Sequence, residues 1–397
     1  MLCSLLAALV ITAAAAPPDD EALGDPLGLA LEVVEDNHLG SFDRETLQRA
    51  ALAGMIESIE SLGGCPGNRL LGADDLVDRG ASERGEREGI GAEFRIVPWR
   101  GLLITEVPPG SAAQRAGLQP GQSVVSVHGE ALDGRSAAEI ADLVGRQPSG
   151  LLELEVEEPG GGARRTLLLP RSRYHITPAR LIQDDGSNII RVKVFSKGSV
   201  EELSTLLRGL EDQPVVLDLR DNPGGDLDEA VGAVDLFLEA GEVIGYEQRR
   251  RTGTRPFVAA REPLHRGPVV ALVNGGTLGT AELFAAALQS SGRAELVGTE
   301  TGGVACATGV YVLPGGMALE IADVAFLTPD NLSWQDSGLS PDHGELLYPK
   351  DVLPAVIAGG DRQLDAARKV LLKRGGSIDA PLNSDIDMPM QEDMGEP

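Results

Sequence analysis

Two nearly continuous apolar runs in the second half of the chain predict buried strands, Val215-Val-Leu-Asp-Leu219 and Val269-Val-Ala-Leu-Val273. Each run continues into a glycine turn and then into a helical pattern. A glycine turn at the N-terminus of a helix presents backbone N–H groups, which stabilise an anion or a developing oxyanion. A catalytic nucleophile is therefore expected beside a turn of this kind.

The alternation of strands and helices extends over residues 189–349. The other predicted elements are a strand at 189–195 and helices at 200–210, 227–238 and 280–290. Pro314-Gly-Gly316 lies between two strand-like runs and predicts a β-hairpin, and residues 361–374 predict a last helix. This order predicts an α/β domain with a largely parallel sheet.

The part of the chain before this domain has two further patterns. Residues 22–62 show helical periodicity, with a helix start near Ser41 or Asp43, whereas the charged, glycine-containing segment 63–88 is interpreted as a solvated loop. From Gly89 to about Arg171 short strands alternate with turns, and residues 136–144 predict a short helix with Ile140, Leu143 and Val144 on one face. A separate, mostly β domain is expected there.

Both ends of the chain differ from the middle. Residues 2–16 are apolar and end in an Ala14-x-Ala16 pattern, which predicts a secretory signal that is cleaved together with Cys3. Cys65 and Cys306 would remain, and the sequence leaves open whether they pair. No other stretch is expected to cross a membrane. The residues after 374 are acidic and predict a disordered tail.

Charge and composition narrow the classes of partner. The net charge of −27 over 397 residues argues against nucleic acid and anionic membranes, because phosphates would repel the protein. The length predicts two or three domains. No group of His, Cys and Asp residues has the spacing of a metal site, and the five histidines lie outside any motif, so neither a cofactor nor a metal is expected.

Taken together, these segments resemble the C-terminal processing (tail-specific) serine peptidases over about residues 25–372. The core motifs are Leu217–Gly225, Thr280–Gln289, Gly292–Gly298 and Ser340-Pro-Asp342, and the PDZ motifs are Gly89-Ile-Gly91 and Ser111–Gly121. The resemblance implies an α/β peptidase core (a mixed β-sheet with helices), an inserted PDZ domain and a helical N-terminal arm. The implied parts are a signal at 1–16, the helical region and loop at 17–88, the PDZ domain at 89–172, the core at 173–374 and the tail at 375–397.

In this family the nucleophile lies three positions before a Glu at the helix start, where the pair forms a capping box. Counting back from Glu282 gives Gly279, and glycine is tolerated at an N-cap. The family's general base is a lysine, and the corresponding position is Val304. A glutamine of some members falls at Thr308, and no lysine occurs from residue 198 to residue 349. The resemblance therefore implies that nucleophile and base are both missing.

Other groups near these positions keep several interpretations open. Thr277, Thr280 and Cys306 are possible substitutes for the nucleophile, although the threonines can simply cap a turn or helix and Cys306 can be buried or bonded to Cys65. Gly224 and Gly225 would keep an oxyanion-hole-like turn. In the PDZ part, the Gly89-Ile90-Gly91-Ala92 loop is expected to take a terminal carboxylate, and Ile140, Leu143 and Val144 either line a side-chain pocket or pack the core.

Three functions follow as hypotheses. The first is an exported, periplasmic or extracellular pseudoprotease that binds protein C-terminal peptides or a partner protein. The second is an active serine-type endopeptidase that cleaves C-terminal tails with displaced catalytic residues. The third is a structural role in an assembly, with the peptide groove unused. Oligomeric state and partner identity do not follow from the sequence.

Overall fold

The structure, a computed structural model, describes residues 25–38, 40–97, 101–136, 139–140, 143–144, 150–346 and 361–375. The predicted signal segment and the predicted tail from residue 376 onward lie outside the described residues. The chain divides after Ser61 into two compact units. Within the described residues, none of the helices combines the length and the apolar character that a bilayer crossing requires.

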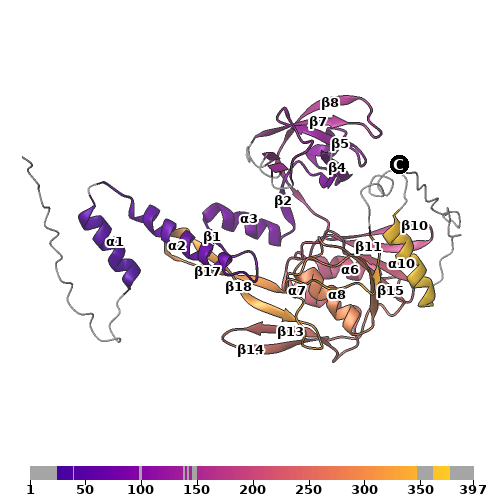
Figure 1. The fold of residues 1–397 in the computed structure, drawn as a ribbon. Coiled ribbons are helices and arrows are strands. Elements are labelled where there is room, and N and C mark those ends of the chain that lie inside the picture. Colours follow the sequence, from indigo (N-terminus) through magenta and orange to yellow (C-terminus); the bar gives the residue numbers. More distant parts are fainter. Residues whose placement is uncertain are drawn as a thin grey trace, which may run out of the picture. The chain divides into compact units, whose positions relative to one another are not determined.

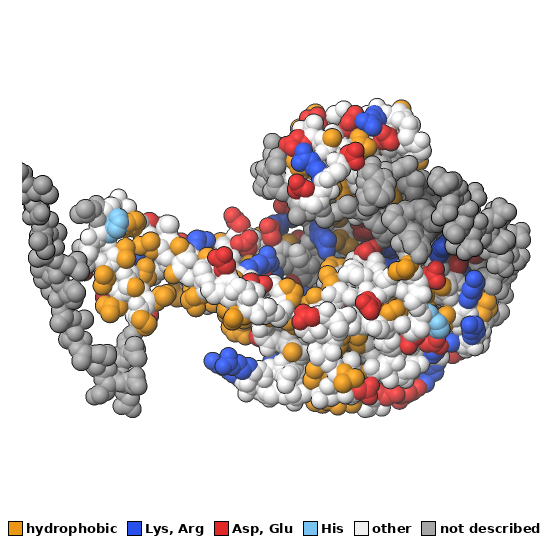
Figure 2. All heavy atoms as spheres, in the orientation of Figure 1, with side chains coloured by type: hydrophobic (Ala, Val, Ile, Leu, Met, Phe, Trp, Pro, Cys, Tyr) orange, Lys and Arg blue, Asp and Glu red, His pale blue; other side chains and the backbone are white. Residues whose placement is uncertain are grey.

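The first unit contains the helices α1 (Pro26–Asn37) and α2 (Arg44–Ser61), as the periodicity of residues 22–62 predicts. Asp43 stands directly before α2 and accepts a hydrogen bond from the backbone N–H of Thr46, which is the predicted helix start. No residue of α1 is buried, and Figure 2 shows its apolar side chains at the surface. These helices therefore form without a hydrophobic core of their own among the described residues.

The segment 63–88 is not the loop that its composition predicts. It contains β1 (Arg69–Leu71), the helix α3 (Ala73–Glu83) and β2 (Glu86–Gly89). Acidic residues stand in the first turn of α3, where the helix dipole favours them, and the Asp75 carboxylate accepts a hydrogen bond from the N–H of Gly72. The many charges are partly paired across elements, which a composition cannot reveal.

The next part is a small β domain, as predicted. Its sheet has the order β3-β4-β5-β7-β8, with every neighbouring pair antiparallel, and a separate strand β9 (Ser172–His175) pairs with β2. The elements are β3 (Glu93–Val97), β4 (Gly101–Glu106), α4 (Ala112–Arg115), β5 (Ser123–Val127), β6 (Glu130–Ala131), β7 (Leu151–Glu157) and β8 (Arg164–Pro170). Of the short helix predicted at 136–144, the described residues 139–140 and 143–144 are helical.

The α/β core follows, with a six-stranded sheet in the order β10-β11-β12-β15-β16-β19. β10 and β11 are antiparallel, and the other neighbours are parallel, so the prediction of a largely parallel sheet is confirmed. The elements are β10 (Ala179–Asp184), β11 (Ser187–Val192), α6 (Ser199–Leu207), β12 (Val215–Asp218), α7 (Leu227–Val234), β15 (Val269–Val273), α8 (Thr280–Ser290), β16 (Ala294–Gly298), β19 (His343–Gly344) and α10 (Arg362–Lys373).

Helices cover both faces of this sheet (Figure 1). On one face, Leu217 and Ala271 belong to a large core with α6, α7 and α8. On the other face, the neighbouring residues Val216 and Leu272 pack against α10. Because successive side chains of a strand point to opposite faces, burial on both sides requires the continuous apolar runs seen in the sequence.

A second, antiparallel sheet has the order β1-β18-β13-β14, with β17 also paired to β18. β17 (Cys306–Val312) and β18 (Ala318–Leu327) form the hairpin predicted around Pro314, closed by the 3₁₀ turn Pro314–Gly316. The hairpin of β13 (Val243–Arg249) and β14 (Gly253–Val258) was not predicted, because it buries little: Ile244 and Gly245 are its buried residues, and Ile244 and Phe257 contribute to the core.

Candidate active site

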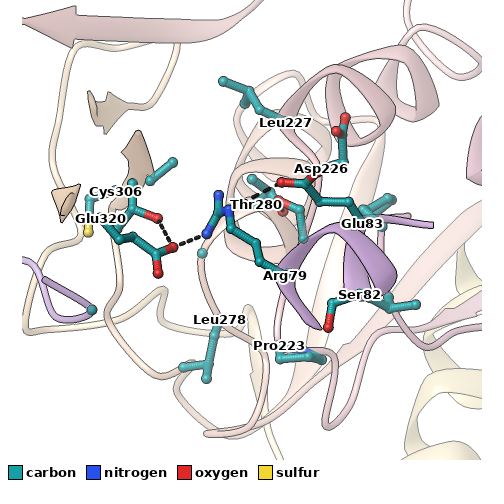
Figure 3. A pocket seen from close by; sticks show the side chains of 18 of the residues that line it. Arg79, Ser82, Glu83, Pro223, Asp226, Leu227, Leu278, Thr280, Cys306 and Glu320 are labelled. Atoms are coloured by element: carbon teal, nitrogen blue, oxygen red, sulfur yellow. Dashed lines mark hydrogen bonds and ion pairs between the residues drawn. The ribbon is translucent and has the colours of Figure 1, made fainter. Parts of the chain in front are cut away.

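A cleft of about 1110 Å³ lies where the turns after β12 and β15 meet β17 and α3. It is lined by all five core positions that the sequence singles out, namely Gly224, Gly225, Gly279, Val304 and Thr308. Figure 3 shows Thr280 and Leu278 beside Pro223 and Asp226, with Arg79 extending from α3 toward Glu320. The structure therefore brings together residues that lie as far as 84 positions apart in the core sequence, from 224 to 308.

The turn between β15 and α8 has the backbone of a nucleophile elbow. Gly279 is the N-cap of α8 and has φ 57° and ψ −121°, a conformation that strains any residue with a side chain. A Cβ atom at Gly279 would have the carbonyl oxygens of Pro223 and Cys306 as its nearest neighbours, at 3.9 and 4.0 Å. The position therefore has space for a side chain on the cleft side, although the sequence supplies none.

The buried carboxylate of Glu282 joins this elbow to the turn that carries residue 304. Its Oε2 accepts hydrogen bonds from the N–H groups of Gly279 at 3.0 Å and Val304 at 2.8 Å. Its Oε1 accepts from the N–H of Gly303 at 2.8 Å and from the Thr301 hydroxyl at 2.5 Å. Four donors thus satisfy one fully buried carboxylate. Glu282 consequently holds Gly279 and Val304 beside each other.

The first glycine turn, after β12, is fastened to the elbow through its own polar residues. The Asn222 side chain is fully buried, accepts from the N–H of Gly224 at 2.9 Å and donates to the carbonyl of Val192 at 3.0 Å. Its backbone carbonyl accepts from the N–H of Leu278, one residue before Gly279, at 2.9 Å. Asp221 and Asn274 also exchange two hydrogen bonds of 2.9 Å across the turns. Both turns are therefore held as one rigid unit.

A buried ion pair anchors the end of β12 just before this turn. Burial alone would raise the pKa of Asp218, but the Arg220 guanidinium donates two 2.8 Å hydrogen bonds to it, and the pKa of Asp218 lies well below its usual range. Arg220 also reaches Asp361 at 2.7 Å, directly before α10. The charge pair thus attaches the last helix to the strand that leads into the cleft.

The hydroxyl and thiol groups proposed as substitute nucleophiles are engaged in structural bonds. Thr277 is fully buried, and its hydroxyl accepts from the N–H of Asn274 and donates to the carbonyl of Leu219, at 3.1 and 2.9 Å. The Thr280 hydroxyl lines the cleft and donates to the carbonyl of Gly225 at 3.3 Å. Cys306 forms a disulfide with Cys65, which answers a question that the sequence left open.

The residues around Val304, the position at which the resemblance implies a lysine base, carry different chemistry. Val304 is apolar, and the Thr308 hydroxyl donates to Glu320 Oε1 at 2.8 Å. Glu320 is buried and is also paired with Arg79 and with Arg69, the latter at 2.6 Å. Among the described residues that line the cleft there is neither a lysine nor a histidine. The Glu320 cluster was missed by sequence reasoning, since both arginines lie in the segment interpreted as a loop.

In the β domain, the residues predicted to bind peptides occupy two neighbouring places. The loop Gly89–Ala92 follows β2, and Gly91 has φ 70° and packs so closely on Ser111 that a Cβ would approach the Ser111 Cβ to 2.3 Å. The apolar side chains of the set are buried in the domain core or, for Val144, pack against it: Ile90, Ala92, Ile140, Leu143 and Val144. Peptide binding by this set stays a prediction.

No metal centre is apparent where the structure has been described, since no three His, Cys, Asp or Glu side chains come together to ligate an ion there.

Comparisons with known proteins show which protein families this chain is similar to. Residues 188–344 match the model of peptidase family S41, and residues 103–158 match the PDZ domain. A carboxyl-terminal-processing protease of Picosynechococcus sp. is 28% identical over 307 residues, which cover 75% of this chain and 73% of that protein. The carboxy-terminal processing protease CtpA of Bacillus subtilis is 26% identical over 321 residues, which cover 80% of this chain and 68% of that protein.

Solved structures agree on the fold. A photosystem II D1 C-terminal processing protease superimposes with a TM-score of 0.54 at 21% identity, covering 85% of this chain and 97% of its own. A Bacteroides fragilis protein described as an S41 protease gives 0.59 at 17% identity, with coverages of 87% and 97%. Because the S41 match spans both turns of the cleft, residues 188–344 form a domain of the peptidase family S41 type, in a chain that is similar over most of its length to carboxyl-terminal processing proteases.

Proposed function

We propose that this chain binds protein C-terminal peptides, or a partner protein that presents one, without hydrolysing them. The observation that carries the proposal is the elbow itself, where Gly279 and Val304 occupy the two positions at which the resemblance places nucleophile and base. An amide is attacked only by an activated nucleophile, and a hydroxyl needs a neighbouring base to become one. Neither group is present at these positions.

The fate of the neighbouring groups supports the same proposal. Thr277 has both a donor and an acceptor bond inside the turn, and Cys306 is oxidised. Thr280 lies in the cleft, but no amine or imidazole lines the described part of the cleft to take its proton. The second hypothesis, hydrolysis by displaced residues, therefore rests on Thr280 alone.

Peptide recognition does not require the missing groups. β3 is an edge strand of its sheet, and its outer edge pairs with no strand in the described part of the chain. An extended peptide can add to such an edge, while backbone N–H groups of the preceding loop take its terminal carboxylate. The Gly89–Ala92 loop stands directly before β3, as this mode of binding requires. The disulfide fits an oxidising compartment and therefore supports export.

Binding is measured by fluorescence anisotropy with a labelled peptide that ends in an apolar residue with a free carboxylate. The amidated peptide is the matched control, because it keeps every side chain and loses only the charge. We expect the free acid to bind at least about tenfold more tightly, the loss expected for one charge-assisted contact. Equal affinity, or no binding of either peptide, contradicts carboxylate recognition and favours the structural role.

Hydrolysis is tested with casein and with the same peptide. We expect purified protein to leave both intact, and the double variant Gly279→Ser/Val304→Lys to acquire measurable cleavage, whereas each single variant stays inactive because the two groups act as a unit. Cleavage by the unmodified protein that is lost in Thr280→Val would establish the second hypothesis instead. A folded but inactive double variant would contradict the claim that the elbow keeps a competent geometry.

A further inference from the structure

The disulfide between Cys65 and Cys306 is part of the cleft wall. Cys306 is the first residue of β17 and lines the cleft, as do Pro66 and Gly67 on the opposite side of the bond. The two Cα atoms are 6.2 Å apart, although 241 positions separate them in the sequence. The bond therefore connects the segment 62–68 directly to the strand that begins two residues after Val304.

The segment 62–68 has little else to hold it in place. Leu62 is 85% exposed, and Asn68 is the only residue of the seven that is buried. The noncovalent ties are polar: Gln335 Nε2 donates to the carbonyl of Gly64 at 3.3 Å, and Asn68 Oδ1 accepts from the N–H of Ala322 at 2.8 Å. A segment without buried apolar side chains opens at a low free-energy cost. Its position consequently depends on the covalent bond.

This segment lies against the residues of the candidate site. A Cβ at Gly67 would be 3.5 Å from the methyl group of Thr308. Gln335 bridges the two sides of the disulfide, because its Oε1 also accepts from the N–H of Ala305 at 2.8 Å. Movement of segment 62–68 would therefore uncover Thr308 and loosen the turn that carries Val304.

The opening would be local. β1 follows directly, is paired in register with β18 over three residues, and its Leu71 is fully buried. Glu282 continues to hold Gly303 and Val304 from the other side. Loss of the disulfide thus releases residues 62–68 and the start of β17 without removing either neighbouring anchor.

We propose that the Cys65–Cys306 disulfide is a thiol-exchange site whose reduction by a dithiol opens the cleft. The inference rests on the proposed function, the binding of C-terminal peptides, extends it by placing part of the bound peptide in the cleft as well as at the β3 edge, and adds the regulation of access to the cleft. Cys65 is half-buried and Cys306 is buried, so the attacking thiolate reaches the sulfur of Cys65.

The exchange is balanced within the two reactants. The reductant's first thiolate forms a mixed disulfide with Cys65, and Cys306 leaves as a thiolate. The second thiol of the reductant then displaces Cys65 and closes a cyclic disulfide. The two protons of the dithiol end on Cys65 and Cys306, and the two electrons pass from the reductant to the protein. The reverse exchange with a disulfide oxidant, which takes up the two electrons and the two protons from Cys65 and Cys306, restores the closed wall.

The clamp itself is tested by hydrogen exchange with mass spectrometry on the full chain, oxidised and in dithiothreitol. We expect exchange of the amides in 62–68 and 305–308 to accelerate at least about tenfold on reduction, because the covalent constraint is lost, while β12 and β15 stay protected. Equal exchange in the two states, or loss of protection throughout the core, overturns the proposal.

Two variants distinguish the effect of the disulfide from the effect of the hydrogen bonds around it. Cys65→Ser/Cys306→Ser should show the fast exchange without reductant and no further response to it. Gln335→Ala removes the polar bridge and should keep a full response to dithiothreitol. If the double cysteine variant fails to fold, the reduced and reoxidised unmodified protein gives the same comparison. A Gln335→Ala protein that no longer responds to dithiothreitol contradicts the role of the disulfide.

Peptide binding shows the consequence for the cleft. We expect the fluorescent peptide with a free apolar C-terminus to associate several-fold faster with the reduced protein than with the oxidised protein. A change in hydrogen exchange without peptide binding in either state contradicts the proposed function and leaves the clamp established. Peptide binding together with unchanged hydrogen exchange retains the proposed function and rejects the clamp.

Discussion

The turn from β12 into α7 and the turn from β15 into α8 are built in the same way. Each follows a buried strand, uses glycines with positive φ, and continues into a helix with Glu at its third position, Glu229 or Glu282. The N-caps differ. The Asp226 side chain caps α7 by accepting a 2.9 Å hydrogen bond from the N–H of Glu229, whereas Gly279 has no side chain with which to cap α8.

This difference shows that the geometry of an elbow and its chemistry have separate causes. The backbone at Gly279 is held by Glu282 and by Asn222, neither of which depends on the residue at position 279 having a side chain. Glycine also adopts the strained conformation at no steric cost. The architecture of the elbow therefore does not require a side chain at position 279.

The largest expected effect is a difference in the free energy of unfolding between alanine variants of the two glutamates. Glu282→Ala leaves four buried donors without a partner and is expected to lower the free energy of unfolding by about 4 kcal/mol. Glu229→Ala removes two 2.9 Å bonds to backbone N–H groups in a partly exposed place and should cost about 1–2 kcal/mol. Urea denaturation measures both. Equal losses would mean that Glu282 does not hold the elbow.

A glycine in each turn gives a second comparison. In Gly225→Ala the new Cβ would approach the Phe195 carbonyl oxygen to 2.0 Å, so we expect a loss of about 3 kcal/mol or more in the free energy of unfolding. In Gly279→Ala the Cβ meets nothing closer than 3.9 Å, and only the backbone strain remains, about 1–2 kcal/mol. Thermal unfolding distinguishes the two. A larger loss at Gly279 would show that the space there is not free.

The smallest expected effect is on the free energy of unfolding at low pH, and it distinguishes the two ends of β12. The fully buried His265 accepts from Arg293 through Nδ1 and contacts the carbonyl of Gln213, so it fastens the segments that enter β12 and β15. Burial and, to a smaller extent, the charge of Arg293 together lower the pKa of His265 from 6.5 to about 4, against the opposing effect of the Gln213 carbonyl. The neutral ring thus stabilises the fold fully above pH 6.5, and this contribution, up to about 3 kcal/mol, is lost as the pH falls toward 4.

The other end of β12 behaves differently, because the pKa of Asp218 is lowered from 3.8 and its contribution persists until the pH falls below that value. Denaturation as a function of pH therefore should show a decline between pH 6.5 and 4 that His265→Gln removes and Asp218→Asn does not. A decline that survives in His265→Gln would assign it to another group.

Elements whose own side chains enter the core were predictable from the sequence. β15 and α8 have the bounds expected from their apolar residues, and the turn residues around Pro314 predicted the hairpin. By contrast, α3 has one buried residue, Ala81, and the outer strand β14 is almost entirely exposed. Hydrophobic periodicity is the main signal for secondary structure, so elements that bury little give little of it.

In the candidate site, too, some residues were predictable from the sequence and others were not. Gly279, Val304 and Thr308 were found by position along a motif, whereas Glu320 with Arg69 and Arg79 was missed. Arg79 and Glu320 are 241 positions apart, and nothing local marks them as partners. Strand register places Arg69 opposite Glu320 across β1 and β18, and the packing of α3 brings Arg79 to the same carboxylate.

By itself the sequence determined the class of fold, the two strand-to-helix turns, and which side chains stand at the motif positions, because local patterns and residue identities are written along the chain. Only the tertiary structure decided that Gly279 and Val304 share one carboxylate, that Cys65 reaches Cys306, and that α3 lines the cleft. These contacts depend on how distant segments pack into one core, and packing is a property of the whole folded chain.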